Sequence, residues 1–297
     1  MVNKEIAVIG AGGRMGSWII KYFLNNKNVR IKAYDKNMYS IERQLNIKIE
    51  LDFNSCVRDS DIVFLCIPLK IIPQIIAECS KIMKRNSVLI DISSIKNKSF
   101  KSLSKIQNYI SPICIHPMFG PGASRDERLK ILFIPVRNYR KEFQFVKQLF
   151  QNFEILPIES ALKHDHIMGV VLGLTHYMNI IFADVIASHQ YKDLKFYAGN
   201  TFRIQCILSE SILNDDIELL NSLFIENPFI KKELRNFHKK YLDYYQMINE
   251  KNDEKLARQL KNIKSSIEEH HDLNSSYVKM YQFVNLLCKE DKYKNKK

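Results

Sequence analysis

Two polar side chains, His116 and Ser94, follow apolar stretches that are typical of strands. His116 stands in "CIHPMFGPG", after the apolar run from Ile110 to Ile115, and Ser94 stands in "DISSIK". The prolines and glycines make the segment after His116 a turn, which would hold the imidazole in one place. An imidazole with its ordinary pKa of about 6.5 can accept a hydroxyl proton near neutral pH. We therefore interpret His116 as a general base and Ser94 as a partner of the same hydroxyl; a turn residue and a helix cap are the structural alternatives.

Arg203 and His176 are candidates for contact with a substrate. Arg203 lies early in the helix opened by "GNTF", and a buried guanidinium could hold a carboxylate with two hydrogen bonds. His176 shares a helix face with Gly169 and Gly173, so that face has little side chain beside the imidazole. Such a face accepts either a ligand or a close neighbouring helix. A surface arginine and a core histidine are the alternatives.

Two groups of metal-ligand residue types are interpreted as solvated helix ends. They are "HDH" at residues 164–166 and "EEHHD" at residues 268–272. Adjacent or alternate positions on a helix do not converge on one ion, so we expect no metal site.

A glycine-rich segment, "AVIGAGGRMGSW", joins the first apolar run to a helix-like segment. A dinucleotide-binding loop occupies this position when a helix N-terminus holds the pyrophosphate. The strict G-x-G-x-x-G pattern is incomplete because Ala11 stands at its first position, whereas Gly10 begins an overlapping pattern. Asp35 is spaced to bind a ribose 2′-hydroxyl, which favours NAD; Lys36 beside it leaves NADP possible. The predicted cofactor-binding residues are Gly10, Ala11, Gly12, Gly13, Arg14, Met15, Gly16, Asp35 and Pro68.

The elements that must position these residues alternate between strands and helices up to residue 160. Near-continuous apolar runs, separated by helix-length segments, predict a parallel sheet covered on both faces. The runs are "IAVIG", "RIKAYD", "DIVFLCIP", "SVLIDISS", "PICIHP", "ILFIPV" and "FEILPIE". We expect an α/β protein with a doubly wound, Rossmann-type dinucleotide-binding domain over residues 1–160. An all-α domain is expected over residues 161–290 and a frayed tail over residues 291–297.

Helical patterns dominate the second half. A long helix is predicted from about Ala161 to His189, and another begins at "ENPFI", where Asn227 can cap it. A third helix carries an apolar stripe, interpreted as core, that consists of Leu256, Leu260, Ile263 and Ile267.

The composition is that of a globular protein. The 297 residues are 46% hydrophobic and 26% charged, with a net charge of +13. The lysines are spread along the chain without a nucleic-acid-binding motif, so we expect no such partner; the cations would instead attract a polyanionic substrate. Histidine, asparagine and aspartate within the apolar segment 167–187 favour a buried helix over a membrane span. Six cysteines without a C-x-x-C pair, and the lack of a secretory leader, favour reduced thiols and a cytoplasmic protein.

The chain resembles the prephenate dehydrogenase family of tyrosine biosynthesis. The resemblance rests on "GAGGRMGSW", "DISSIK", "HPMFGPG", "HDHIMGVVLGLTHYMN" and "TFRIQ", in the order and at the spacing typical of the family. It implies NAD-dependent oxidation and decarboxylation of prephenate to 4-hydroxyphenylpyruvate, and a homodimer formed through the helical half. The roles that it implies are proton acceptance for His116, hydrogen bonding for Ser94, carboxylate binding for Arg203, and lining of the substrate pocket for His176 and Lys96.

Other activities stay open at this stage. Arogenate differs from prephenate only in the side-chain amino group, and another two-domain hydroxyacid dehydrogenase or a non-catalytic dinucleotide-binding regulator would share much of the pattern. The joint presence of Ser94, His116 and Arg203 favours an enzyme. With His116 as the base, kcat/KM is expected to rise with pH around about 6 to 7, unless carboxylates raise that midpoint or burial lowers it.

Overall fold

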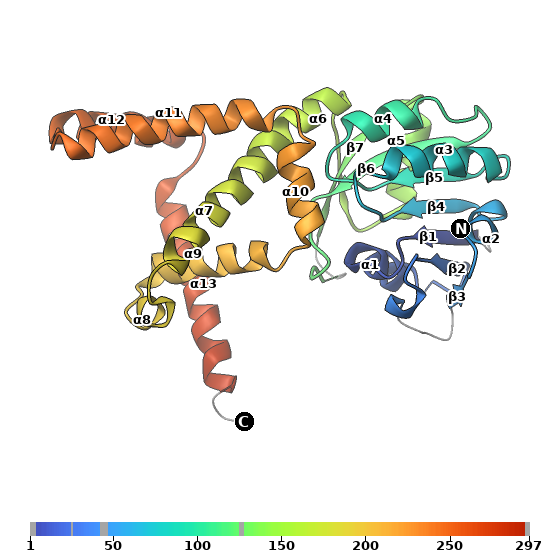
Figure 1. The fold of residues 1–297 in the computed structure, drawn as a ribbon, viewed down its shortest axis with the longest axis horizontal. Coiled ribbons are helices and arrows are strands. Elements are labelled where there is room, and N and C mark those ends of the chain that lie inside the picture. Colours follow the sequence, from blue (N-terminus) through green and yellow to red (C-terminus); the bar gives the residue numbers. More distant parts are fainter. Residues whose placement is uncertain (1–3, 25, 42–46, 125–127, 295–297) are drawn as a thin grey trace. The chain divides into compact units, whose positions relative to one another are not determined.

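One eight-stranded sheet forms the centre of the N-terminal half (Figure 1). The computed structural model describes residues 4–24, 26–41, 47–124 and 128–294. The strand order is β3-β2-β1-β4-β5-β6-β7-β8, so the chain runs outward from β1 first to one side and then to the other. This doubly wound arrangement confirms the predicted fold class. The strands are β1 Lys4–Ile9, β2 Val29–Tyr34, β3 Ile47–Ile49, β4 Ile62–Leu65, β5 Val88–Asp91, β6 Ser111–Pro117, β7 Lys130–Ile134 and β8 Glu154–Pro157.

The sheet departs from the predicted parallel order at β7. This strand runs antiparallel to β6 and parallel to β8. No helix occurs in the described residues between Pro117 and Lys130, and an antiparallel neighbour needs no helical crossover. The short strand β3, "IKI", is not among the predicted strands, because three residues are too few to show a hydrophobic period.

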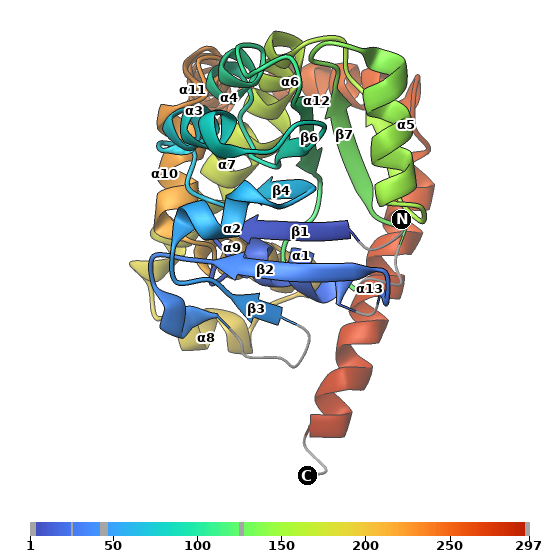
Figure 2. The ribbon, with the colours of Figure 1, turned by 90° about the vertical axis from the view of Figure 1, so that its right-hand side faces the viewer.

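Helices cover both faces of the sheet, as predicted. The core on one face joins alternate β1 residues, Ile6 and Val8, to Trp18 of α1 and Val146 of α5. The other face of β1 packs against the remaining helices of this half. Figure 2 shows β1, β2 and β4 side by side across the sheet. The helices are α1 Arg14–Phe23 and α5 Tyr139–Leu149 on the first face, and α2 Phe53–Arg58, α3 Ile72–Ile82 and α4 Asn97–Leu103 on the second.

The chain divides into two compact units. The sheet unit contains Met1–Gly173 and Asp216–Ile230, and the helical unit contains Leu174–Asp215 and Lys231–Lys297. The sheet unit thus extends beyond the boundary predicted at residue 160. The reason is packing, because α6 (Ala161–Met168) and α10 (Ile217–Ile225) supply Met168 and Leu223 to a small core cluster with Ile95 and Leu132.

The long helix predicted from Ala161 is continuous to Ala187, with a π-helical segment, Gly169–Leu174, between α6 and α7. The last helix reaches Lys294, so the described part of the predicted frayed tail is helical, and residues 295–297 lie outside the described residues. The helices of the helical unit are α7 Thr175–Ala187, α8 Tyr191–Phe196, α9 Asn200–Leu213, α11 Ile230–Asn249, α12 Asp253–Glu268 and α13 Leu273–Lys294.

Two apolar segments that were predicted to be buried are largely exposed. The helix Ala161–Ala187 is long and apolar enough to cross a membrane by length and composition, and 22% of its most apolar window is buried. On α12, Leu260, Ile263 and Ile267 are 54%, 40% and 44% exposed, so the predicted core stripe is wrong for this single chain. A helical period identifies an apolar face but not the element that covers it.

Candidate active site

The carboxyl ends of four parallel strands bring the predicted site residues to one edge of the sheet. β1, β4, β5 and β6 run parallel to one another. Gly10 follows β1, Asp91 ends β5, and His116 is the penultimate residue of β6. Open α/β sheets bind ligands at this edge. Prediction of these strands therefore placed the glycine loop and His116 at the same edge.

His116 is buried and is hydrogen-bonded to a second histidine. Its Nδ1 lies 3.0 Å from Nε2 of His164, and Nδ1 of His164 lies 2.8 Å from Oδ1 of Asp165. His164 and Asp165 are fully buried, and His116 is 4% exposed. Asp165 also accepts the backbone N–H groups of Lys96 at 2.7 Å and Asn97 at 2.8 Å, which ties α6 to the start of α4. Three side chains from two distant segments thus form one hydrogen-bonded chain.

Lys96, predicted to contact the substrate, is directed into the protein. It is fully buried, and its Nζ donates to Oδ2 of Asp91 at 2.9 Å and to the carbonyl of Ile115 at 2.5 Å. The carbonyl of Asp91 and the Ser93 hydroxyl lie 3.3 and 3.4 Å from the same nitrogen. An ammonium has three donors, and these acceptors use them. The substrate-binding role of Lys96 is therefore corrected: it ties β5 to β6 beneath His116.

Both histidines are easier to keep neutral than an exposed imidazole. Burial lowers the pKa of His116 well below its ordinary value of 6.5, and the nearby His164 and Lys96 lower it further. Burial also lowers the pKa of His164, although the hydrogen bond to Asp165 opposes this shift. The imidazole of His116 is consequently neutral at neutral pH.

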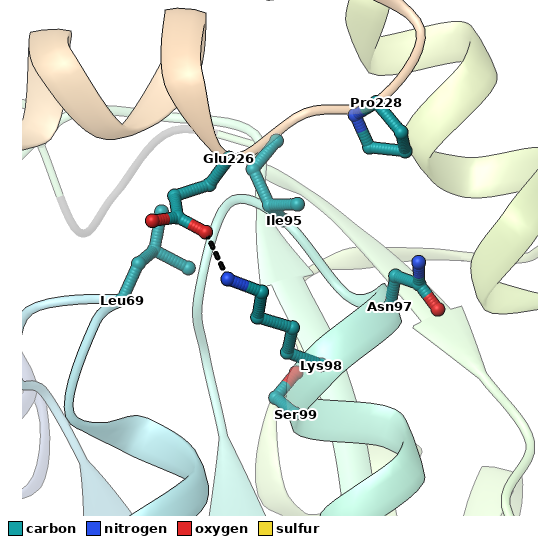
Figure 3. A pocket seen from close by; sticks show the side chains of 7 residues that line it. All are labelled: Leu69, Ile95, Asn97, Lys98, Ser99, Glu226 and Pro228. Atoms are coloured by element: carbon teal, nitrogen blue, oxygen red, sulfur yellow. Dashed lines mark hydrogen bonds and ion pairs between the residues drawn. The ribbon is translucent and has the colours of Figure 1, made fainter.

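Ser94 is half-buried and does not cap α4. The cap position belongs to Lys96, and within the described residues the Ser94 hydroxyl has no hydrogen-bond partner. The helix-cap alternative is therefore wrong. Beside Ile95, the next residue, a cavity of about 170 Å³ opens against the loop after α10. Figure 3 shows Lys98 and Glu226 paired across this cavity, which leaves both charges compensated.

The glycine loop has the backbone geometry that a dinucleotide requires. Gly10 has a φ of 82°, and a Cβ there would lie 2.1 Å from the carbonyl oxygen of Cys66. A Cβ on Gly16 would lie 2.1 Å from the Gly10 carbonyl oxygen, so α1 packs closely on the loop. The left-handed position falls on Gly10, and therefore Ala11 does not disturb the turn. Gly13 begins α1 without a side-chain cap, and the first amide groups of a helix have no acceptor within it.

Asp35 adjoins the loop, as its spacing predicts. One carboxylate oxygen accepts the N–H of Gly12 and the other accepts the N–H of Asn37, both at 3.0 Å. Each oxygen keeps a further lone pair. Lys36 and Pro68 are exposed on segments that follow β2 and β4. These residues fit a bound dinucleotide at this edge of the sheet.

Arg203 and His176 lie in the helical unit, on α9 and α7, and both are half-buried. The structure therefore assigns them to a different unit from His116 and Ser94. Gly169 and Gly173, on the face predicted to be open beside His176, meet a protein segment instead. A Cβ at Gly169 would lie 3.3 Å from Cβ of Phe229. Of the two alternatives, a close neighbour accounts for these glycines.

The sequence interpretation missed His164 and Asp165. They belong to "HDH", which was set aside as a solvated helix end, and both are fully buried. The argument against a metal considered only positions along one helix, whereas their partners come from β6 and α4. No local pattern in the sequence pairs these residues with His116 or Lys96, because the partners lie 48 and 69 positions away.

Two protein-family models match most of the chain. One is the prephenate dehydrogenase nucleotide-binding domain, over residues 22–133, and the other is the prephenate dehydrogenase dimerization domain, over residues 160–262. The second match begins within one residue of α6.

Curated relatives and solved structures resemble the chain at low identity. The probable arogenate/prephenate dehydrogenase of Methanocaldococcus jannaschii is 23% identical over 87% of this chain, which spans 60% of that protein. The cyclohexadienyl dehydrogenase of Zymomonas mobilis is 24% identical, over 74% of this chain and 82% of that protein. A prephenate dehydrogenase structure from A. aeolicus, in complex with hydroxyphenyl propionate and NAD+, has a TM-score of 0.71 at 21% identity, covering 91% and 99% of the two chains. The arogenate dehydrogenase of Synechocystis has a TM-score of 0.64 at 16% identity, covering 90% and 100%. These structures share the fold.

Proposed function

The chain belongs to the prephenate dehydrogenase family, and from this premise we propose that it catalyses the NAD-dependent oxidative decarboxylation of prephenate to 4-hydroxyphenylpyruvate and carbon dioxide. The observation that carries the proposal is His116, a buried and neutral imidazole at the sheet edge that also carries the glycine loop. A reaction that removes a hydride from a carbon bearing a hydroxyl needs a base for the hydroxyl proton.

The proposed chemistry divides between the residues of the sheet unit and the cofactor. His116 accepts the ring hydroxyl proton while the hydride leaves the same carbon, and the Ser94 hydroxyl hydrogen-bonds to that oxygen. The bond to the ring carboxylate breaks, its electrons complete the aromatic ring, and carbon dioxide leaves. The product oxygen then recovers the proton from His116. NAD supplies the hydride acceptor.

The residues of the glycine loop and Asp35 would hold NAD. Gly10 and Gly16 permit the close turn, the amide groups at the start of α1 face the pyrophosphate, and the free lone pairs of Asp35 accept the ribose 2′-hydroxyl. A 2′-phosphate would be repelled by the same carboxylate. Arg14, Met15 and Pro68 remain proposed cofactor contacts.

Two residues of the helical unit have proposed roles toward the substrate. Arg203 is proposed to hold a substrate carboxylate through charge-assisted hydrogen bonds, and His176 to line the pocket. The same unit is proposed to form a homodimer, which is supported by the dimerization-domain match and by the exposed apolar stripe on α12. A partner surface would bury side chains that are costly to leave in water.

Arogenate is the second candidate substrate, because the names of relatives include arogenate dehydrogenases. The test is to follow the absorbance of reduced nicotinamide with prephenate and with arogenate, each with NAD and with NADP. We expect turnover with prephenate and NAD. Turnover of arogenate alone would transfer the proposal to that substrate, and no turnover of either would reject it.

The variant Asp35→Ala tests the proposed preference for NAD. We expect the ratio of kcat/KM for NAD to that for NADP to fall about tenfold, because the partner of the 2′-hydroxyl and the repulsion of a phosphate are both lost. Asp59→Ala, on the same sheet unit, is the matched control. An unmodified protein that prefers NADP would show that Lys36 or another cation governs this site.

A further inference from the structure

The hydrogen-bonded chain of Asp165, His164 and His116 determines which ring nitrogen of His116 can act as the base. We propose that Asp165 and His164 are positioning residues that hold the His116 imidazole with its hydrogen on Nδ1, so that Nε2 accepts the substrate proton. The inference rests on the proposed function for its catalytic meaning and adds the reacting atom and two residues that support it. Its structural content can be measured without any substrate.

Asp165 determines which ring nitrogen of His164 carries a hydrogen. Oδ1 accepts the N–H of Lys96 and Oδ2 accepts the N–H of Asn97, at 2.7 and 2.8 Å. With backbone donors on both oxygens, the carboxylate acts as an acceptor toward His164 as well. The contact of 2.8 Å between Oδ1 and Nδ1 of His164 therefore requires a hydrogen on that nitrogen.

His164 in turn determines which ring nitrogen of His116 carries a hydrogen. Burial lowers the pKa of His164, so its ring is neutral near pH 7 and carries one hydrogen. That hydrogen is on Nδ1, which leaves Nε2 as an acceptor. The contact of 3.0 Å from Nε2 to Nδ1 of His116 then places a hydrogen on the latter nitrogen. Among the described residues the remaining nitrogen of His116, Nε2, has no hydrogen-bond partner, which leaves its lone pair available.

Charged groups lie close to both imidazole rings. Lys96 donates to the carbonyl of Ile115, the residue before His116, and so places a cation beside the base; Asp91 is paired with that cation. Asp165 is bonded to His164. When Nε2 of His116 gains a proton, its Nδ1–H still donates to the neutral His164, and the Asp165 carboxylate lies next in the hydrogen-bonded series.

The burial of these three hydrogen-bonded side chains also suits the proton balance of the proposed reaction. Prephenate and NAD+ give 4-hydroxyphenylpyruvate, carbon dioxide and NADH, and no proton is released overall. In the proposed mechanism His116 holds the hydroxyl proton and returns it to the product oxygen, which agrees with this balance. His116, which would hold the proton, is 4% exposed, and its partners His164 and Asp165 are fully buried.

The first test is the tautomer of His116 in the free protein. Selective ¹⁵N labelling of histidine and NMR near pH 7.5 distinguish a protonated ring nitrogen from a bare one. We expect His116 and His164 both to carry hydrogen on Nδ1, the tautomer that is less favoured in free histidine. The signals are assigned by their loss in His116→Asn and His164→Gln. A hydrogen on Nε2 of His116 would overturn the inference whether or not the protein turns over prephenate.

Two variants of His164 then link the tautomer to catalysis. His164→Phe removes the acceptor, and we expect the His116 tautomer to change and kcat to fall on the order of 10² to 10³. His164→Gln can still accept from Nδ1 through its amide oxygen, so it should keep the tautomer and lose about tenfold in kcat. His166→Gln, on the exposed side of α6, is the matched control.

The outcomes separate this inference from the proposed function. The expected tautomer without turnover of prephenate or arogenate rejects the function and leaves the positioning role standing. Turnover with the expected tautomer, with KM and NAD affinity unchanged in both variants, supports both. A folded His164→Phe with normal kcat and an unchanged pH profile would show that His164 only packs against His116.

Discussion

The two units of this protein differ in what they bury. The sheet unit encloses polar groups together with apolar ones: Asp91, Lys96, His164 and Asp165 are fully buried, and each has a partner. In the described residues of the helical unit, buried apolar side chains are limited to Ala183, Ile186, Cys206, Met247 and Val284. Large apolar side chains of that unit lie on its surface instead.

This difference indicates what each unit is suited to do. A buried charge is tolerated only where partners are fixed, so the sheet unit holds its polar chain in one arrangement before any ligand binds. An exposed apolar face gains stability when another surface covers it. The sheet unit is thus suited to chemistry that needs fixed geometry, and the helical unit is suited to association.

The largest expected effect comes from replacing His116, the proposed proton acceptor of the hydrogen-bonded side chains. His116→Asn keeps hydrogen-bonding capacity but cannot take the proton, so kcat should fall on the order of 10² to 10⁴. NAD affinity, measured by fluorescence titration, should persist because the glycine loop is unaltered. His189→Asn, at an exposed position, is the control. Near-normal turnover would make the turn at "HPMFGPG" structural and direct attention to His176.

The next largest effect is expected from charges placed on the exposed apolar stripe of α12. Leu260→Asp with Ile263→Asp places charges on the stripe, and in a two-fold interface each change occurs twice. At about 1.5–3 kcal/mol for each buried side chain, the dissociation constant of the proposed dimer should rise at least about 10³-fold. Sedimentation velocity measures it. The control, Asn262→Asp with Ser265→Asp, adds the same charges elsewhere on α12. A persistent dimer would place the interface on another face.

Arg203→Ala separates binding from chemistry. A hydrogen bond to a charged group contributes about 1.5–3 kcal/mol, so KM for prephenate should rise about ten- to a hundredfold with a modest change in kcat. Steady-state kinetics with Arg258→Ala, an exposed arginine on α12, as the control measures this difference. An unchanged KM would return Arg203 to the surface role that was its alternative.

The smallest effect concerns pH. Burial, His164 and Lys96 lower the pKa of His116, so the base stays neutral as the pH falls through 6.5. An ordinary imidazole would lose about tenfold in kcat/KM by about pH 5.5. Because the pKa of His116 is lowered, we expect a smaller loss at that pH. The midpoint of about 6 to 7 expected from the sequence is revised downward accordingly. A measured midpoint in that range would show that solvent reaches His116.

Protein stability should follow the same shift. In the unfolded chain His116 and His164 bind protons near pH 6.5, whereas in the folded protein their lowered pKa values keep them neutral at that pH. The free energy of unfolding should therefore decrease as the pH falls below 6.5. His116→Asn should make this decrease shallower in thermal unfolding measured across pH.

The sequence by itself determined the strands of the parallel core, the glycine loop, Asp35 and the turn at His116. Each of these depends on local rules: a hydrophobic period, a backbone conformation open to glycine, or a spacing within one strand–helix–strand unit. For this reason the fold class and the family could be predicted from motifs read one at a time. The roles of Ser94, Arg203 and His176 are predictions of the same kind.

Only the tertiary structure decided the partners of these residues. His116 and His164 are separated by 48 positions, and Asp165 is 69 positions from Lys96, so no local period could pair them. The inward direction of Lys96, the reversed strand β7 and the exposed stripe on α12 have the same origin. Each depends on which distant segment packs against a residue, and that choice is made by the free energy of the whole packed unit.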